Sequence, residues 1–165
     1  MQHLNFYTTL FKNMLQSAPD QAEHLQEEVN ILIHKLKFIS QDQRPTVLIL
    51  AQQTGFEPLI NEQIVESVAI AGGKLLTEKY ENPSILILVQ ENNKLYTAVP
   101  ELIQDEILSR TTAVESNHIF IIQKTDFGKN PHNFLHDTEI CAEIIQPKYF
   151  IYGHKGTDWV QFDIA

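Results

Sequence analysis

The sequence has little of what marks an exported, disulfide-linked protein or a nucleic-acid-binding one. Its 165 residues contain a single cysteine, Cys141, so no intramolecular disulfide can form. Lysine and arginine together number 12 against 21 aspartates and glutamates, and these cations are scattered along the chain. Because phosphate binding needs clustered cations, we expect no nucleic-acid partner.

The first residues also lack the pattern of a leader peptide. Residues 1–15 have no positively charged start and no unbroken apolar core. No stretch of the chain is apolar for long enough to span a membrane, so we expect no membrane span. As written, the chain is expected to be cytoplasmic, and it would be periplasmic if an export signal has been removed.

The fingerprints of the common α/β enzymes are absent as well. The sequence contains no GxGxxG or GxxxxGK[ST] phosphate loop, no GxSxG elbow and no CxxC pair. Cys141 lies among Ile140, Ala142 and Ile144 in a helical pattern, which predicts a small buried apolar side chain rather than a nucleophile. We therefore predict a protein that is not an enzyme, with no cofactor.

Three apolar segments are the strongest positive feature. Thr46–Leu50, Ile85–Val89 and His118–Gln123 are continuous apolar runs rather than alternating ones. Such runs are typical of strands buried on both faces of a parallel sheet. Lys74–Leu76 is a further short strand candidate, and helical patterns lie between the strands. The expected fold class is α/β, a three-layer α/β/α domain with a small, mainly parallel sheet of about four strands.

Helical periodicity occupies much of the remaining sequence. We predict a short amphipathic N-terminal helix and a long helix from Asp20 to about Ser40, whose apolar stripe lies most simply on the sheet. Further helices are expected over 58–71, after Pro100 and over 131–146. The segment that contains Trp159 and Phe162 is expected to pack back as an extended edge of the sheet. The whole chain, 1–165, is expected to form one domain: an N-terminal helical segment (1–40), an α/β lobe (45–150) and a tail (151–165).

Polar residues follow each of the three strong strands. Ligands of open α/β sheets bind at the carboxyl ends of the strands, so these loops are the expected binding site. Phe56 could stack on a flat ligand or instead be the hydrophobic contact that fixes the start of the next helix. The candidate ligand-binding residues are Gln52, Gln53, Thr54, Phe56, Gln90, Glu91, Asp126, Phe127 and Lys129.

A second cluster, His132, His136, Glu139 and Glu143, projects from one sector of the 131–146 helix. A histidine pair at i, i+4 with carboxylates one turn on could bind a transition metal. The segment HNFLH lacks the glutamate of HExxH, which excludes the metalloprotease motif. We favour a solvated helix face and assign no metal ligand, although metal binding by His132 and His136 stays open.

Between about residues 20 and 150, five segments follow one another in a recognisable order: RPTVLIL, VESVAIAGGKLL, NPSILILV, TTAVESNHIFII and AEIIQPKYF. The most specific part is the tail signature, in which Ala113-Val114 and Asn117-His118-Ile119-Phe120 precede a closing helix at Ala142–Phe150. This order of features resembles the C-terminal lobe of class III substrate-binding proteins of ABC importers.

This resemblance implies a non-catalytic ligand-binding domain of the iron–siderophore, haem or cobalamin class. A small-molecule metal chelate and an importer permease would be its partners. The family binds ligand between two lobes, and the pattern of the N-terminal lobe does not occur in this sequence. Residues 129–133 (KNPHN) stand where many relatives have an arginine and Pro-Gly-Pro-Arg, so an arginine clamp for an anionic ligand is not preserved.

An alternative function is a protein–protein interaction module that oligomerises through its N-terminal helices and binds no small molecule. The apolar positions Leu4, Tyr7, Phe11 and Met14 of the first helix favour it. A homodimer would also serve the first hypothesis, because two copies could rebuild a two-walled cleft.

Overall fold

The computed structural model describes residues 3–79 and 81–163, and its sheet is built on three parallel strands that lie side by side. They are β1 (Thr46–Ala51), β4 (Ile85–Val89) and β5 (Ile119–Ile122). Leu88 of β4 pairs with Leu50 on one side and with Ile121 on the other. Apart from half-buried Thr46, every residue of these strands is buried, as their continuous apolar sequences predict. The predicted parallel arrangement is confirmed.

Three further strands extend the sheet at its edges. Two of them pair with β1 along the same side: β2 (Glu57–Pro58), which is antiparallel, and β3 (Lys74–Leu75), which is parallel. The third, β6 (Trp159–Phe162), is antiparallel to β5, so the predicted C-terminal edge is present. The order is β2-β1-β4-β5-β6, with β3 beside β1. The sheet therefore has six strands instead of about four, because the short hairpin strand β2 and the edge strand β6 join it.

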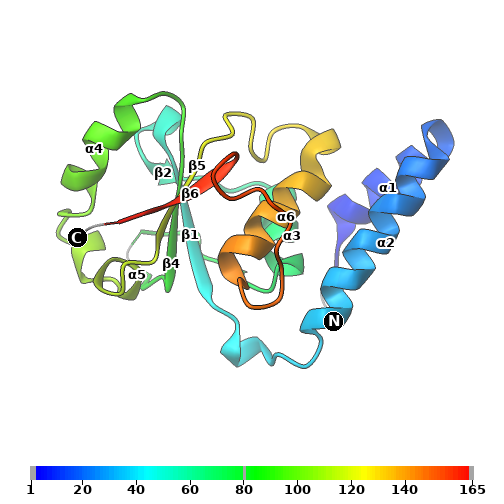
Figure 1. Cartoon of the computed structure of the whole chain (residues 1–165), viewed down its shortest axis with the longest axis horizontal. Helices are drawn as coiled ribbons and strands as arrows, with labels where there is room; N and C mark the ends of the chain where they lie inside the picture. Colours follow the sequence, from blue (N-terminus) through cyan, green and yellow to red (C-terminus); the bar gives the residue numbers. More distant parts are fainter. Residues whose placement is uncertain (1–2, 80, 164–165) are drawn as a thin grey trace.

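Helices cover both faces of the sheet, which confirms the three-layer α/β/α class (Figure 1). α3 (Glu62–Ile70) and α6 (Phe134–Ile145) lie on one face, and α4 (Lys94–Leu102) and α5 (Thr112–Glu115) lie on the other. Each face has its own apolar core. The 3₁₀ turns are η1 (Gln41–Gln43), η2 (Gln52–Thr54), η3 (Leu108–Arg110) and η4 (Pro131–Asn133).

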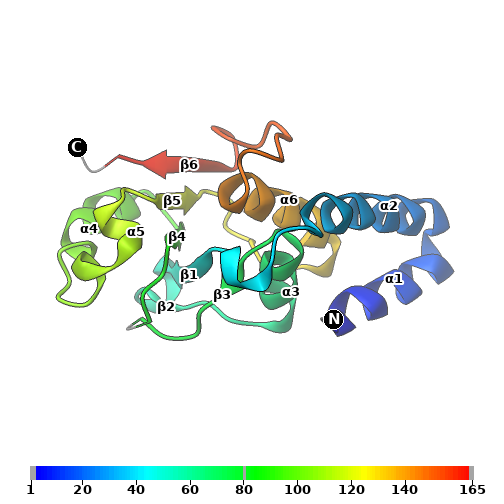
Figure 2. The same cartoon turned by 90° about the horizontal axis from the view of Figure 1, so that it is seen from below.

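The two N-terminal helices form a hairpin outside the three layers (Figure 2). α1 (Asn5–Ser17) packs on α3, and α2 (Pro19–Leu36) packs on α3 and α6. The expectation that the long helix lies on the sheet is wrong, because α3 and α6 already cover that face. Its predicted apolar stripe is buried against these two helices instead. None of the described helices is long and apolar enough to cross a membrane.

α1 is fixed to the domain through its N-terminus. The carboxylate of Glu66, which is buried on α3, accepts hydrogen bonds from the backbone N–H groups of Phe6 (2.7 Å) and Tyr7 (2.8 Å). Both of these aromatic rings pack on Phe134, with ring centroids 5.3 and 6.2 Å from it. The aromatic face of α1 is therefore half-buried against the domain's own core rather than free for a partner, which removes the observation that favoured the interaction module.

Two helix boundaries differ from the prediction, each for a local reason. The helix expected from residue 58 begins at Glu62, because Pro58 pairs back on β1 and Asn61 caps the helix by accepting from the N–H of Ile64 (2.9 Å). Pro100 lies in the last turn of α4 and does not begin a helix. A proline there removes only one backbone hydrogen bond just before the helix ends.

Candidate functional site

A cavity of about 360 Å³ lies at the carboxyl ends of β1, β4 and β5. Its apolar wall comes from strand ends and adjoining loops: Ala51, Leu59, Val89 and Phe127. Its polar wall is contributed by the loops that follow the three strands: Gln53, Thr54, Gln90, Glu91, Thr125, Asp126 and Lys129. An apolar concavity with a few convergent polar groups is the usual form of a small-molecule site.

Most of the predicted binding residues line this cavity, and only Gln52 and Phe56 do not. The side-chain oxygen of Gln52 accepts hydrogen bonds from the N–H groups of Glu91 (2.7 Å) and Asn92 (3.0 Å), so Gln52 joins the first loop to the second. Phe56 is half-buried against the apolar core under α4. It neither lines the cavity nor fixes the start of α3. Thr125 and Leu59 were missed because they carry no charge or motif.

The loop after β1 owes its shape to two consecutive residues in the left-handed region, Gly55 (φ 69°) and Phe56 (φ 63°). The N–H of Phe56 donates to the carbonyl of Ala51 at 2.8 Å, which closes the turn and returns the chain along β1 as β2. A phenylalanine at positive φ is uncommon and costs free energy, here offset by the burial of its ring. This tight reversal leaves Gln53 and Thr54 at the edge of the cavity.

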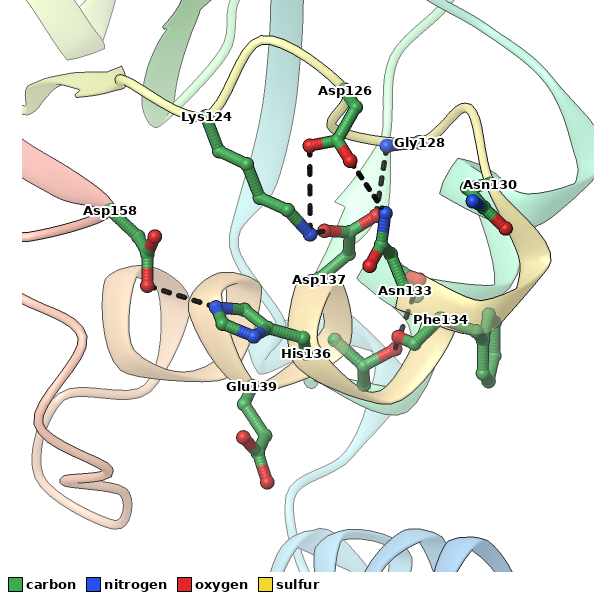
Figure 3. Close-up of polar contacts among 12 residues, drawn as sticks. Lys124, Asp126, Gly128, Asn130, Asn133, Phe134, His136, Asp137, Glu139 and Asp158 are labelled. Carbon is green, nitrogen blue, oxygen red and sulfur yellow. Dashed lines mark hydrogen bonds and ion pairs between the residues drawn. The ribbon is translucent and has the colours of Figure 1, made fainter. Parts of the chain in front are cut away.

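The loop after β5 is fastened from below by Asp137, which is buried on α6 (Figure 3). Its carboxylate accepts from Lys124 Nζ at 2.7 Å and from the N–H of Gly128 at 2.8 Å. Burial raises the pKa of Asp137, and the hydrogen bonds from Lys124 and Gly128 and the charge of Lys124 offset part of that rise. The ammonium of Lys124 is thereby engaged within the protein and is not presented to a ligand.

Gly128 is required at its position for two reasons. Its φ is +74°, and a Cβ there would lie 2.5 Å from Ile64 Cδ1 on α3. The carbonyl of Gly128 also accepts from Asn61 Nδ2 at 3.0 Å. This loop lies close to α3, and its Phe127 is buried and forms part of the cavity's apolar wall, whereas Thr125, Asp126 and Lys129 are exposed.

The charges at the cavity are two carboxylates and one ammonium. Lys129 Nζ donates to Gln53 Oε1 at 2.7 Å and so connects the loop after β5 with the loop after β1. Asp126 Oδ2 accepts from Asn133 Nδ2 at 2.8 Å, and Glu91 follows β4. These groups can donate hydrogen bonds to a ligand and accept them from it. Because the carboxylates outnumber the ammonium, they favour a neutral or positively charged ligand.

The predicted histidine cluster is not brought together as expected. His132 is exposed in η4, whereas Glu143 is buried and accepts N–H groups from the segment that follows α6, including those of Tyr152 and Gly153. The expectation of a solvated helix face is therefore wrong for Glu143, because residues 151–158 fold back over this side of α6. Cys141 is buried, as predicted, and burial raises the pKa of its thiol.

Neither a protein-family model nor a curated protein matches the sequence. Solved structures do match the fold. An ABC transporter solute-binding protein from Sulfurospirillum deleyianum has 17% identity and a TM-score of 0.64, over 88% of this chain and 52% of that one. S. aureus IsdE, solved in complex with haem, has 19% identity and a TM-score of 0.61, over 85% and 63%. Helicobacter pylori CeuE, solved with nickel and histidine, has 12% identity and a TM-score of 0.62, over 86% and 52%.

These likenesses establish the fold. The resemblance to class III solute-binding proteins of ABC transporters is confirmed at that level. The chain spans between 52% and 63% of the length of these proteins.

Proposed function

We propose that this chain is a non-catalytic ligand-binding lobe of the solute-binding type, with its site in the cavity at the carboxyl ends of β1, β4 and β5. The observation that carries the proposal is the convergence of three separate loops on one cavity with an apolar wall and a polar rim. The structural neighbours include proteins solved with haem and with a nickel chelate, which supports a metal chelate as the ligand.

The charges at the rim narrow the class of chelate. Glu91 and Asp126 outnumber Lys129, and the Lys124 ammonium is held mainly by Asp137 at 2.7 Å and more weakly by Asp126 at 3.9 Å. A polyanionic ligand would meet two carboxylates and no arginine among the residues that line the cavity. We therefore propose a neutral or cationic chelate, such as a ferric trihydroxamate siderophore or a cobalamin, rather than a ferric tris-catecholate.

A single lobe supplies one wall of a cleft, so most of a bound chelate would stay in water and affinity would be low. A second wall, from another copy of this chain or from a partner such as an importer permease, would raise it. Light scattering with and without the chelate tests the homodimer directly.

The ligand screen is a thermal-shift and calorimetric titration with a cationic ferric trihydroxamate, cyanocobalamin, haem and a trianionic ferric tris-catecholate. We expect stabilisation by at least one neutral or cationic chelate, because a ligand that binds only the folded state raises the melting temperature. Lack of response to all four would overturn the proposal. A response to the tris-catecholate alone would overturn the charge argument.

Two variants locate the site. Thr54→Trp fills the cavity from the exposed loop after β1 and should abolish binding, whereas Thr9→Trp on the exposed side of α1 should leave it unchanged. Asp126→Asn should weaken a cationic chelate by up to about 5-fold, because an exposed charge pair contributes about 0.2–1 kcal/mol. The matched charge control is Glu101→Gln on α4, outside the cavity.

A further inference from the structure

A second cluster of potential ligand atoms lies where residues 151–158 cross α6. Among the described residues, one group of three or more histidine, cysteine or acidic side chains has its ligand atoms all within 4.8 Å of one another: His136, His154 and Asp158. Asp158 Oδ2 lies 2.9 Å from His136 Nε2 and 3.4 Å from His154 Nδ1. Figure 3 shows His136 reaching from α6 toward Asp158. None of the three lines the cavity at the strand ends.

The segment that carries His154 and Asp158 is held rigidly on α6. Glu143 Oε2 accepts from the N–H groups of Tyr152 (2.7 Å) and Gly153 (3.1 Å), and its Oε1 accepts from the N–H of His154 (3.2 Å) and from Trp159 Nε1 (3.0 Å). The N–H of Asp158 donates to the carbonyl of His154 at 2.8 Å, which closes a turn between the two. The backbone that carries His154 and Asp158 is therefore fixed on α6 by a buried carboxylate and a closed turn.

Two of the three separations between donor atoms are close to those of a tetrahedral metal site, and the third is within 4.8 Å. An ion such as Zn²⁺, with bonds of about 2.0–2.1 Å, holds neighbouring donors about 3.3 Å apart. The two distances to Asp158 Oδ2, 2.9 and 3.4 Å, lie around this value. The side chains are 42% (His136), 19% (His154) and 20% (Asp158) exposed, so an ion can reach them from solvent while the cluster stays partly shielded.

Nε2 of His154, the nitrogen that does not face Asp158, contacts a carboxylate, as the second nitrogen of a metal-bound histidine usually does. His154 Nε2 lies 2.9 Å from Glu139 Oε1 on α6. A carboxylate on that nitrogen fixes the tautomer in which Nδ1 carries the free lone pair, and it makes the ring a stronger ligand. The imidazole rings of His136 and His154 stack in the metal-free protein, with centroids 4.4 Å apart and planes 21° from parallel, so one ring has to turn before both nitrogens point at the same ion.

We propose that His136 Nε2, His154 Nδ1 and the carboxylate of Asp158 form a binding site for a divalent transition-metal ion of the zinc type, with Glu139 as the positioning residue. Two imidazoles and one carboxylate suit zinc, nickel or copper rather than magnesium or calcium. They leave one tetrahedral position for water or for a side chain of a partner. This site is distinct from the chelate cavity and does not depend on its function.

The test is a calorimetric titration of the tag-free, EDTA-treated full chain with Zn²⁺, and with Co²⁺ as a spectroscopic probe. We expect one ion per chain and a tetrahedral Co²⁺ absorption spectrum. His136→Ala and Asp158→Asn should each abolish binding, and Glu139→Gln should weaken it by about 10–100-fold. The matched control, His132→Ala, removes an exposed histidine four residues from His136 and should change nothing.

Absence of saturable binding by Zn²⁺ and Co²⁺ would overturn the proposal. Binding that survives both His136→Ala and Asp158→Asn would overturn it too. Because His136 is well exposed, His136→Ala should keep the unfolding midpoint of the metal-free protein, which separates loss of a ligand from loss of fold. Thr54→Trp, which fills the chelate cavity, should leave zinc affinity unchanged.

Discussion

Three buried carboxylates each hold the backbone of a neighbouring segment through its N–H groups. Glu66 accepts the N–H groups that begin α1, Asp137 accepts the N–H of Gly128, and Glu143 accepts those of residues 152–154. Each is at most 5% exposed. A carboxylate held by backbone N–H groups is among the stronger hydrogen-bond arrangements, and leaving those groups unpaired is costly. At the residue scale, these three charges therefore stabilise contacts between segments inside the protein.

Glu143→Gln tests this role for one of the three. Burial would raise the pKa of Glu143, but the hydrogen bonds from Trp159, Tyr152 and Gly153 and the nearby His154 outweigh it, so the net pKa is lowered and the group is ionised at neutral pH. Glu143→Gln replaces one accepting oxygen by an NH₂ group, which faces N–H donors and leaves them without an acceptor. We expect a loss of about 2 kcal/mol in the free energy of unfolding, from urea denaturation at pH 7.

The control for that measurement is Glu106→Gln, an exposed position in the loop after α4. It should change the free energy of unfolding by less than about 0.5 kcal/mol. Equal effects of the two substitutions would show that the hydrogen bonds to Glu143 add nothing to stability.

At the scale of elements, α1 depends on α3 for its N-terminal cap. Leu4 precedes the helix and provides no side-chain hydrogen bond, so the Glu66 carboxylate substitutes for a local cap. We expect Glu66→Ala to destabilise the protein by about 1–2 kcal/mol. Amide hydrogen exchange should accelerate first in α1, because its anchoring N–H groups lose their acceptor.

Glu27→Ala, on the exposed side of α2, is the control and should leave exchange in α1 as it is in the wild type. If Glu66→Ala gave uniform acceleration over the whole chain, α1 would be part of one cooperative unit and the cap would have no local effect.

The elements that sequence reasoning found are those whose pattern is local. The continuous apolar runs of β1, β4 and β5 specify strands without reference to anything else, and α3 ends at Ile70, next to the predicted end at residue 71. The errors fall where a distant segment decides the outcome. Residues 57–58 form β2 because they pair with β1, and the side of α6 around Glu143 is buried because residues 152–154 cover it.

The same distinction applies to the candidate site. The rule that ligands bind at the carboxyl ends of strands was enough to predict that Gln53, Gln90 and Lys129 lie at one place, and all three line the same cavity. It could not show that Gln52 instead joins two loops through its side chain. The sequence also could not show that His154 and Asp158 lie beside His136, because that contact depends on how the C-terminal segment crosses α6.

At the scale of the whole molecule, the fold is shared with solved solute-binding proteins, and the proposed contact surface for a chelate is a single rim. The three loops at that rim are joined to one another by Gln52 and by the Lys129–Gln53 hydrogen bond. A ligand on any one loop is therefore expected to affect all three. We propose that this rim binds a metal chelate.

The most direct measurement of that claim is a set of backbone amide NMR spectra recorded while a diamagnetic gallium analogue of the ferric trihydroxamate, or cyanocobalamin, is added to the full chain. We predict that the largest shift changes fall in the loops at 52–54, 90–91 and 125–129 and saturate together. The Thr54→Trp variant should show none of them. Shift changes confined to α1 and α2, or none at concentrations that saturate the calorimetric signal, would contradict the account.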